Sequence, residues 1–142
     1  MKTRTIGYWA ATALTAFAFG SGGAMDLAAP PDMLAGMQHL GYPAYFLTIL
    51  GVWKVLGAAA VVAPRLPRLK EWAYAGIAFD LTGASLSHAM AGDDAGKVIT
   101  PLVLLAIAAA SWALRPADRV LGAIVPARAD APAHGAVPVA AE

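Results

Sequence analysis

The chain has 142 residues, of which 59% are hydrophobic and only 13% charged, with a formal net charge of +1. An average soluble domain carries about 25% charged residues, so this composition favours a single membrane domain. The small net charge argues against nucleic acid as a partner. The sequence has no cysteine, which excludes disulfides, CxxC redox motifs, iron–sulfur clusters and Cys-ligated zinc.

Four apolar runs each approach the roughly 20 residues that a helix needs to cross a bilayer. They cover residues 6–25, 44–63, 71–90 and 98–114. Backbone groups in lipid must be satisfied within their own segment, so we expect every run to be a helix. The predicted fold class is therefore all-α: a four-helix transmembrane bundle that forms one membrane domain over residues 1–115.

Basic residues gather on one side of these runs. The side with the termini and the middle loop, residues 64–70, has Lys2, Arg4, Arg65, Arg68, Lys70, Arg115, Arg119 and Arg128. The other side has Lys97 alone, beside four aspartates. The positive-inside rule then predicts that both termini face the cytoplasm. An alternative takes the first run as a cleaved signal peptide, which would leave three spans.

Three segments lie outside the predicted spans. Residues 31–42 have apolar side chains at helical spacing and end at Gly41 and Pro43, which predicts a short interfacial helix on the outer side. Residues 116–125 form a possible interfacial helix on the inner side. Residues 126–142 are rich in Ala and Pro, and we expect them to be disordered.

Two charged side chains fall inside the predicted spans. Lys54 lies ten residues before Pro64, and Asp80 lies ten residues after Lys70. In antiparallel helices joined by the middle loop, the 1.5 Å rise per residue puts both charges about 15 Å deep, near the bilayer midplane. An unpaired charge there is costly, so we expect Lys54 and Asp80 to face each other as an ion pair. The pair either binds a ligand or only fixes the helix register.

A possible outer vestibule consists of His88, Asp26 and Ser87. His88 lies about two helical turns outward of Asp80. Its simpler interpretation is an interfacial histidine that hydrogen-bonds a loop. His39 is on the polar side of the short helix, and we expect it to be merely solvated. The sequence contains no catalytic motif and no metal-ligand motif, so no catalytic residue and no metal site is predicted.

The sequence of residues 51–88, GVWKVLGAAAVVAPRLPRLKEWAYAGIAFDLTGASLSH, resembles the DoxX-like membrane proteins, as does the preceding LGYPAYF of residues 40–46. The resemblance extends over all four runs. Its markers, specific as a set, are Lys54, the Pro-Arg-Leu-Pro loop with Lys70-Glu71-Trp72, Asp80 and Ser87-His88. It implies a four-helix bundle in the bacterial cytoplasmic (inner) membrane. The family takes its name from a subunit of a terminal oxidase and thiosulfate:quinone oxidoreductase system, and some relatives are described as partners of redox enzymes.

Three functions are compatible with these features. The leading hypothesis is a redox-associated subunit that binds a quinone or lipid-like molecule near Lys54, Asp80 and His88. Such a subunit would be at most an accessory part of a membrane oxidoreductase. The alternatives are a small-solute channel or transporter, which would need an oligomer, and a membrane scaffold without a site of its own. The expected partners are the lipid bilayer, a redox-enzyme subunit and further copies of the chain.

Overall fold

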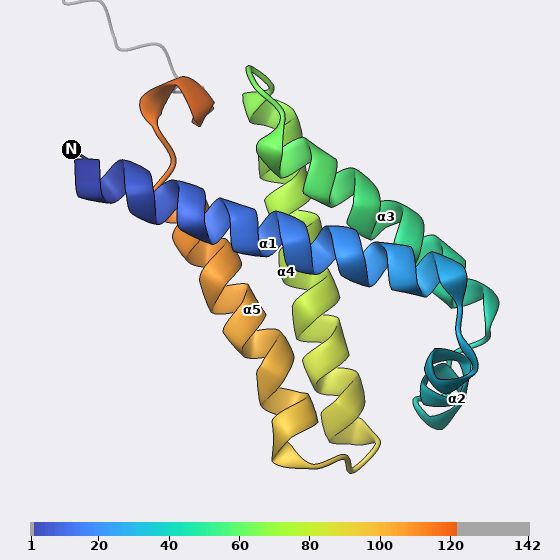
Figure 1. Ribbon diagram of the computed structural model, residues 1–142. Helices are drawn as coiled ribbons and strands as arrows, with labels where there is room; N and C mark the ends of the chain where they lie inside the picture. The colour runs from blue at the N-terminus through green and yellow to red at the C-terminus, as the bar shows by residue number, and fades with distance from the viewer. Residues whose placement is uncertain (1, 122–142) are drawn as a thin grey trace, which may run out of the picture.

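The computed structural model describes residues 2–121, which are helical throughout apart from turns and loops (Figure 1). Five α-helices follow one another along the chain, and no strand occurs in this part. They are α1 (Lys2–Ala28), α2 (Pro31–His39), α3 (Tyr45–Val62), α4 (Pro67–Met90) and α5 (Ala95–Ala113), followed by the short 3-10 helix η1 (Ala117–Arg119). The all-α fold class is thereby confirmed.

The loop between α3 and α4 is shorter than the sequence predicts. It was expected over residues 64–70, but α4 already begins at Pro67, because proline is well tolerated at the first position of a helix. Lys70 is therefore helical, and its Nζ donates to the carbonyl oxygens of Ala60, at 3.0 Å, and Val61, at 2.6 Å. The last carbonyls of a helix lack intrahelical partners, so this buried lysine caps the end of α3.

The helices pack in two closely associated pairs, α1 with α3 and α4 with α5, and α1 also packs against α5. A shared core connects them, and it is formed by Phe19, Ala58, Val61, Tyr74, Ile77, Leu81 and Ala108. α3 and α4 converge at the loop that joins them and diverge toward α2 and the loop between α4 and α5 (Figure 1). This divergence positions the site described below.

Large apolar side chains cover the outside of the helices. On α4, Trp72 is 82% exposed, Phe79 78% and Met90 81%, which is typical of a surface that faces lipid and not water. By length and composition, α3 and α5 are each able to cross a membrane.

At the C-terminal end, the possible interfacial helix of residues 116–125 is represented only by η1, because the described part of the chain ends at residue 121. The expected disordered tail, residues 126–142, lies outside the described residues.

Candidate functional site

Two glycines let α1 and α3 approach each other closely. A Cβ atom on Gly23 would lie 2.9 Å from the carbonyl oxygen of Gly51 and 2.9 Å from the Cβ of Lys54. A Cβ atom on Gly51 would likewise lie 2.9 Å from the carbonyl oxygen of Gly23. Both distances are shorter than a normal contact, so only glycine fits at either position. Small residues are the usual means by which membrane helices approach this closely.

Asp26 and Lys54 form an ion pair across this contact. The Nζ of Lys54 lies 2.9 Å from the Oδ2 of Asp26, and the two side chains are 22% and 3% exposed. Lys54 therefore pairs with Asp26, and the prediction that it pairs with Asp80 is wrong. The prediction placed Asp26 beyond the end of the first span, but α1 continues to Ala28, so the carboxylate is inside the protein.

Asp80 lies in the middle of α4 and is half-buried. Its carboxylate forms no hydrogen bond or ion pair with any residue that the structure describes. Asp80 nevertheless lines the same cavity as Lys54 and Asp26. The sequence thus predicted that Lys54 and Asp80 share a site, but it missed that the first helix contributes the counter-charge.

The cavity between α3 and α4 has a volume of about 470 Å³, within the range of about 300–1,000 Å³ typical of small-molecule sites. Its walls are mainly apolar, formed by Met33, Gly36, Met37, Leu40, Tyr42, Phe46, Leu47, Leu50, Phe79, Gly83 and Ala84. Its polar groups belong to Asp26, His39, Lys54, Asp80, Ser87, His88, Asp93 and Lys97. All three predicted vestibule residues, Asp26, Ser87 and His88, therefore line one cavity.

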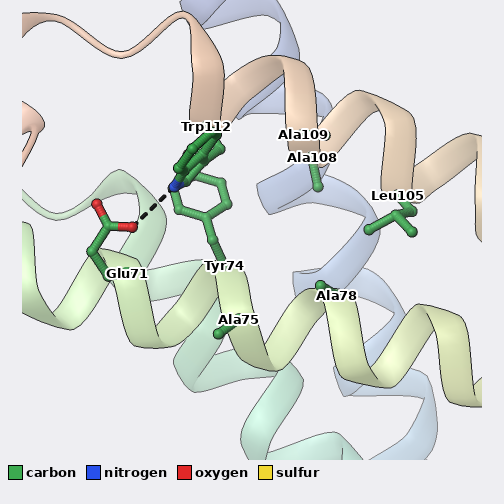
Figure 2. A pocket seen from close by; sticks show the side chains of 8 residues that line it. All are labelled: Glu71, Tyr74, Ala75, Ala78, Leu105, Ala108, Ala109 and Trp112. Atoms are coloured by element: carbon green, nitrogen blue, oxygen red, sulfur yellow. Dashed lines mark hydrogen bonds between the residues drawn. The ribbon is translucent and has the colours of Figure 1, made fainter.

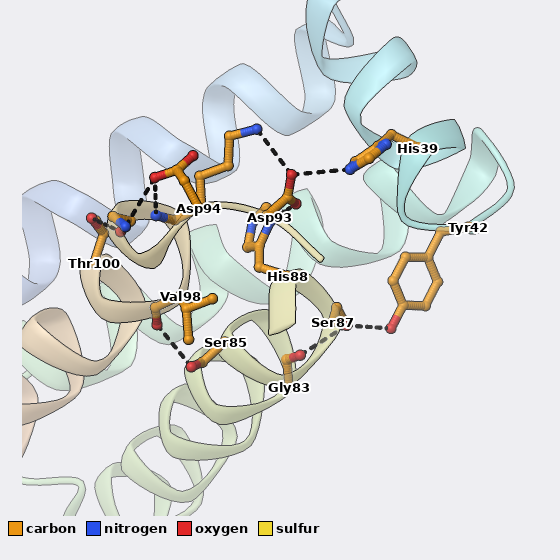
Figure 3. Close-up of polar contacts among 12 residues, drawn as sticks. His39, Tyr42, Gly83, Ser85, Ser87, His88, Asp93, Asp94, Val98 and Thr100 are labelled. Atoms are coloured by element: carbon orange, nitrogen blue, oxygen red, sulfur yellow. Dashed lines mark hydrogen bonds and ion pairs between the residues drawn. The ribbon is translucent and has the colours of Figure 1, made fainter. Parts of the chain in front are cut away.

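Asp93, in the loop between α4 and α5, joins three elements at this end of the cavity (Figure 3). Its Oδ1 lies 3.0 Å from the Nε2 of His39 and 3.2 Å from the Nζ of Lys97, and its Oδ2 lies 2.7 Å from the Nδ1 of His88. The hydrogen bond with His88, supported by those with Lys97 and His39, lowers the pKa of Asp93 to about 2, although burial acts in the opposite direction. His39 is thus not merely solvated, because it connects α2 to the loop after α4.

Tyr42 and Phe46 close the cavity on the side of α2. Ser87 donates its hydroxyl proton to the carbonyl oxygen of Gly83 at 2.8 Å. The hydroxyl of Tyr42 lies 2.8 Å from the Oγ of Ser87. Because the proton of Ser87 is used on Gly83, Tyr42 is the donor in this second hydrogen bond. The rings of Tyr42 and Phe46 are stacked, with centroids 5.0 Å apart. Both residues belong to the motif LGYPAYF, but the sequence alone gave no signal that their rings line a site.

A second groove, of about 290 Å³, lies between α4 and α5 beside Glu71 and Trp112 (Figure 2). Its floor is formed by alanines, and at one end the Nε1 of Trp112 donates to the Oε2 of Glu71 at 2.9 Å. The other oxygen of Glu71 pairs with the Nη1 of Arg115 at 2.7 Å. Because both oxygens of Glu71 are already engaged by Trp112 and Arg115, the groove is a weaker candidate than the cavity between α3 and α4.

A buried chain of hydroxyl groups connects α1, α4 and α5. The Oγ of Ser111, on α5, lies 2.7 Å from the Oγ1 of Thr12, on α1, and 2.7 Å from the hydroxyl of Tyr74, on α4. Neutral hydrogen bonds of this kind fix helix positions. The sequence showed Thr12 and Ser111 only as isolated polar residues. Within the described residues, no group of three His, Cys, Asp or Glu side chains could hold a metal ion.

Comparison with known proteins identified one family. Residues 10–111 of the chain match the model of the DoxX-like family. No curated protein and no solved structure showed a significant match. The matched segment includes α2, α3 and α4 in full as well as Asp26, Asp93 and Lys97, so it contains every residue that lines the cavity between α3 and α4.

Proposed function

The chain belongs to the DoxX-like family, and we propose that it is a multi-pass membrane protein that binds a quinone or another lipid-like ligand in the cavity between α3 and α4. In this proposal the protein lies in the bacterial cytoplasmic membrane with both termini inside. It acts there as an accessory subunit of a membrane redox enzyme.

Helix lengths and surface character support four crossings. α1 has 27 residues and α4 has 24, which correspond to about 40 Å and 36 Å at 1.5 Å per residue, more than the roughly 30 Å of a hydrocarbon core. α3 and α5 meet the criteria of length and apolarity. The cluster of basic residues at one end of these helices supports an inward orientation of that end.

The observation that carries the ligand assignment is a mainly apolar cavity that contains the ammonium group of Lys54. Lys54 uses one N–H on Asp26, and an ammonium group has three donors. The others are available to a carbonyl oxygen in the cavity, since the side chain of Lys54 is 22% exposed there. A quinone combines an apolar body with such carbonyl oxygens. The cavity therefore offers an apolar wall and a hydrogen-bond donor to one molecule.

The redox partner belongs to the same proposal. The sequence has no cysteine and no catalytic motif, so electrons would reach the ligand from another subunit. Self-association is compatible with the exposed apolar residues of α4, and these would otherwise face lipid.

The proposed function can be tested by extracting the purified protein with organic solvent and measuring quinone by chromatography. We expect about one quinone per chain in the unmodified protein. Leu50→Trp fills the cavity from within α3, so it should lower this ratio strongly. Val52→Trp is the matched control, because Val52 is on the same helix, 42% exposed and not part of the cavity. A folded protein that retains no quinone, or equal retention in both variants, would refute the proposal.

A further inference from the structure

The charged side chains that line the cavity between α3 and α4 do not balance. Three carboxylates line it, those of Asp26, Asp80 and Asp93, and two ammonium groups, those of Lys54 and Lys97. Lys54 pairs with Asp26, and Lys97 pairs with Asp93. Asp80 remains as the one lining carboxylate without a direct ion-pair partner, and the carboxylates and ammonium groups by themselves give the cavity a formal charge of −1.

An unmatched carboxylate within a membrane helix is unfavourable unless a proton or a cation compensates it. A metal ion is a poor candidate, because among residues 2–121 no group of three His, Cys, Asp or Glu side chains is arranged so that it could hold one. The walls of the cavity that Asp80 lines are mainly apolar instead, and they include Met33, Met37 and Leu50. These walls favour a cation whose charge is carried by an apolar body.

Aromatic rings line the same cavity. Tyr42 and Phe46 stack on each other at its outer side, and Phe79 precedes Asp80 on α4. The faces of aromatic rings attract organic cations, and ammonium ligands in particular are recognised in this way. Phe79 is also 78% exposed, so the cavity reaches the outer surface of α4, where a molecule dissolved in lipid could enter.

We propose that this cavity binds lipophilic organic monocations, with Asp80 as their counter-charge and the aromatic rings as their contact surface. The inference shares the cavity with the proposed function, but it rests on the charge of Asp80 and not on the donors of Lys54. A quinone and such a cation would therefore compete for one space through different polar contacts.

The test uses the purified full chain in non-ionic detergent and equilibrium dialysis with radiolabelled tetraphenylphosphonium, an apolar monocation. We expect saturable binding of one cation per chain. Asp80→Asn should weaken the affinity at least tenfold. Asp94→Asn is the matched control: it removes the same charge from an aspartate outside this cavity, and Asn serves equally well at the helix N-cap that Asp94 forms. Its affinity should stay within twofold of the unmodified protein.

Two further measurements keep the test independent of how well Asp80→Asn folds. Phe79→Leu, at an exposed position, should weaken cation binding several-fold because it removes the ring and keeps the apolar bulk. Tetraphenylsilane, the neutral analogue of the cation, should not displace it. The inference is overturned by absence of saturable binding, by an Asp80→Asn protein that binds as tightly as the unmodified one, or by equal displacement by the neutral analogue.

Quinone retention separates this inference from the proposed function. Retained quinone without cation binding refutes the inference alone. Cation binding without retained quinone supports the inference and refutes the quinone assignment. Absence of both ligands refutes both.

Discussion

The ion pair between Lys54 and Asp26 should show strong energetic coupling when its two members are replaced singly and together. Lys54→Met leaves the carboxylate of Asp26, which is only 3% exposed, without its counter-charge. Breaking a buried pair in this way typically costs about 3–5 kcal/mol. Asp26→Leu should cost less, about 2–3 kcal/mol, because the ammonium group of Lys54 is 22% exposed and can turn toward the cavity.

The double variant Lys54→Met/Asp26→Leu replaces both charges by apolar groups, so it should recover at least about 2 kcal/mol relative to Lys54→Met. The free energy of unfolding can be measured by titrating the purified protein in mixed micelles with a denaturing detergent and following circular dichroism. Lys54→Met/Asp80→Leu is the control, measured together with the single variant Asp80→Leu. The coupling free energy of Lys54 with Asp80 should be smaller than that of Lys54 with Asp26, because Lys54 forms its direct ion pair with Asp26. A larger coupling free energy with Asp80 than with Asp26 would mean that Asp80 is the true partner of Lys54.

Three further predictions concern other parts of the molecule. Gly23→Ala should destabilise the protein by about 1–3 kcal/mol, because the new Cβ would lie 2.9 Å from the carbonyl oxygen of Gly51. Gly76→Ala is the control, since nothing lies within 4 Å of a Cβ there. It should be neutral or stabilising in the same detergent titration. The lowered pKa of Asp93, about 2 in the folded protein against an ordinary value of 3.8, contributes stability above about pH 4 that is lost as the pH falls toward 2. Thermal unfolding should therefore distinguish the unmodified protein from Asp93→Asn at pH 5 and show a shrinking difference toward pH 2; a constant difference would contradict this. Ser111→Ala removes the shared partner of two buried hydroxyl groups and should cost about 1–3 kcal/mol, and a loss below 0.5 kcal/mol would show that those groups find other partners.

Much of the fold could be predicted from the sequence, because apolar length determines which segments become helices in lipid. All four apolar runs lie on helices, and the short helix begins at Pro31 as expected. The bounds differed where polar residues continue a helix beyond its apolar part. α1 extends to Ala28 and α4 starts at Pro67, and hydropathy alone contains no signal for such extensions.

The candidate site was predicted only in part. The sequence predicted that Lys54 and Asp80 share a site because the two residues lie equally far along the chain from the middle loop. The pair of Lys54 with Asp26 depends on the close approach of α1 and α3 at Gly23 and Gly51. Such helix packing cannot be read from residue spacing along the chain. The glycines near the end of the first run were visible in the sequence, but their partner on α3 was not.

The central claim, that the cavity between α3 and α4 is the ligand site, is tested most directly by photolabelling. A quinone that carries an azide on its ring is added to the protein in lipid, irradiated, and located by mass spectrometry of the resulting peptides. We predict labels on the cavity residues of α3 and α4, near Leu50 and Gly83, and their loss in the presence of excess unlabelled quinone. Labels confined to the groove between α4 and α5, around Ala75 and Ala109, would contradict the account.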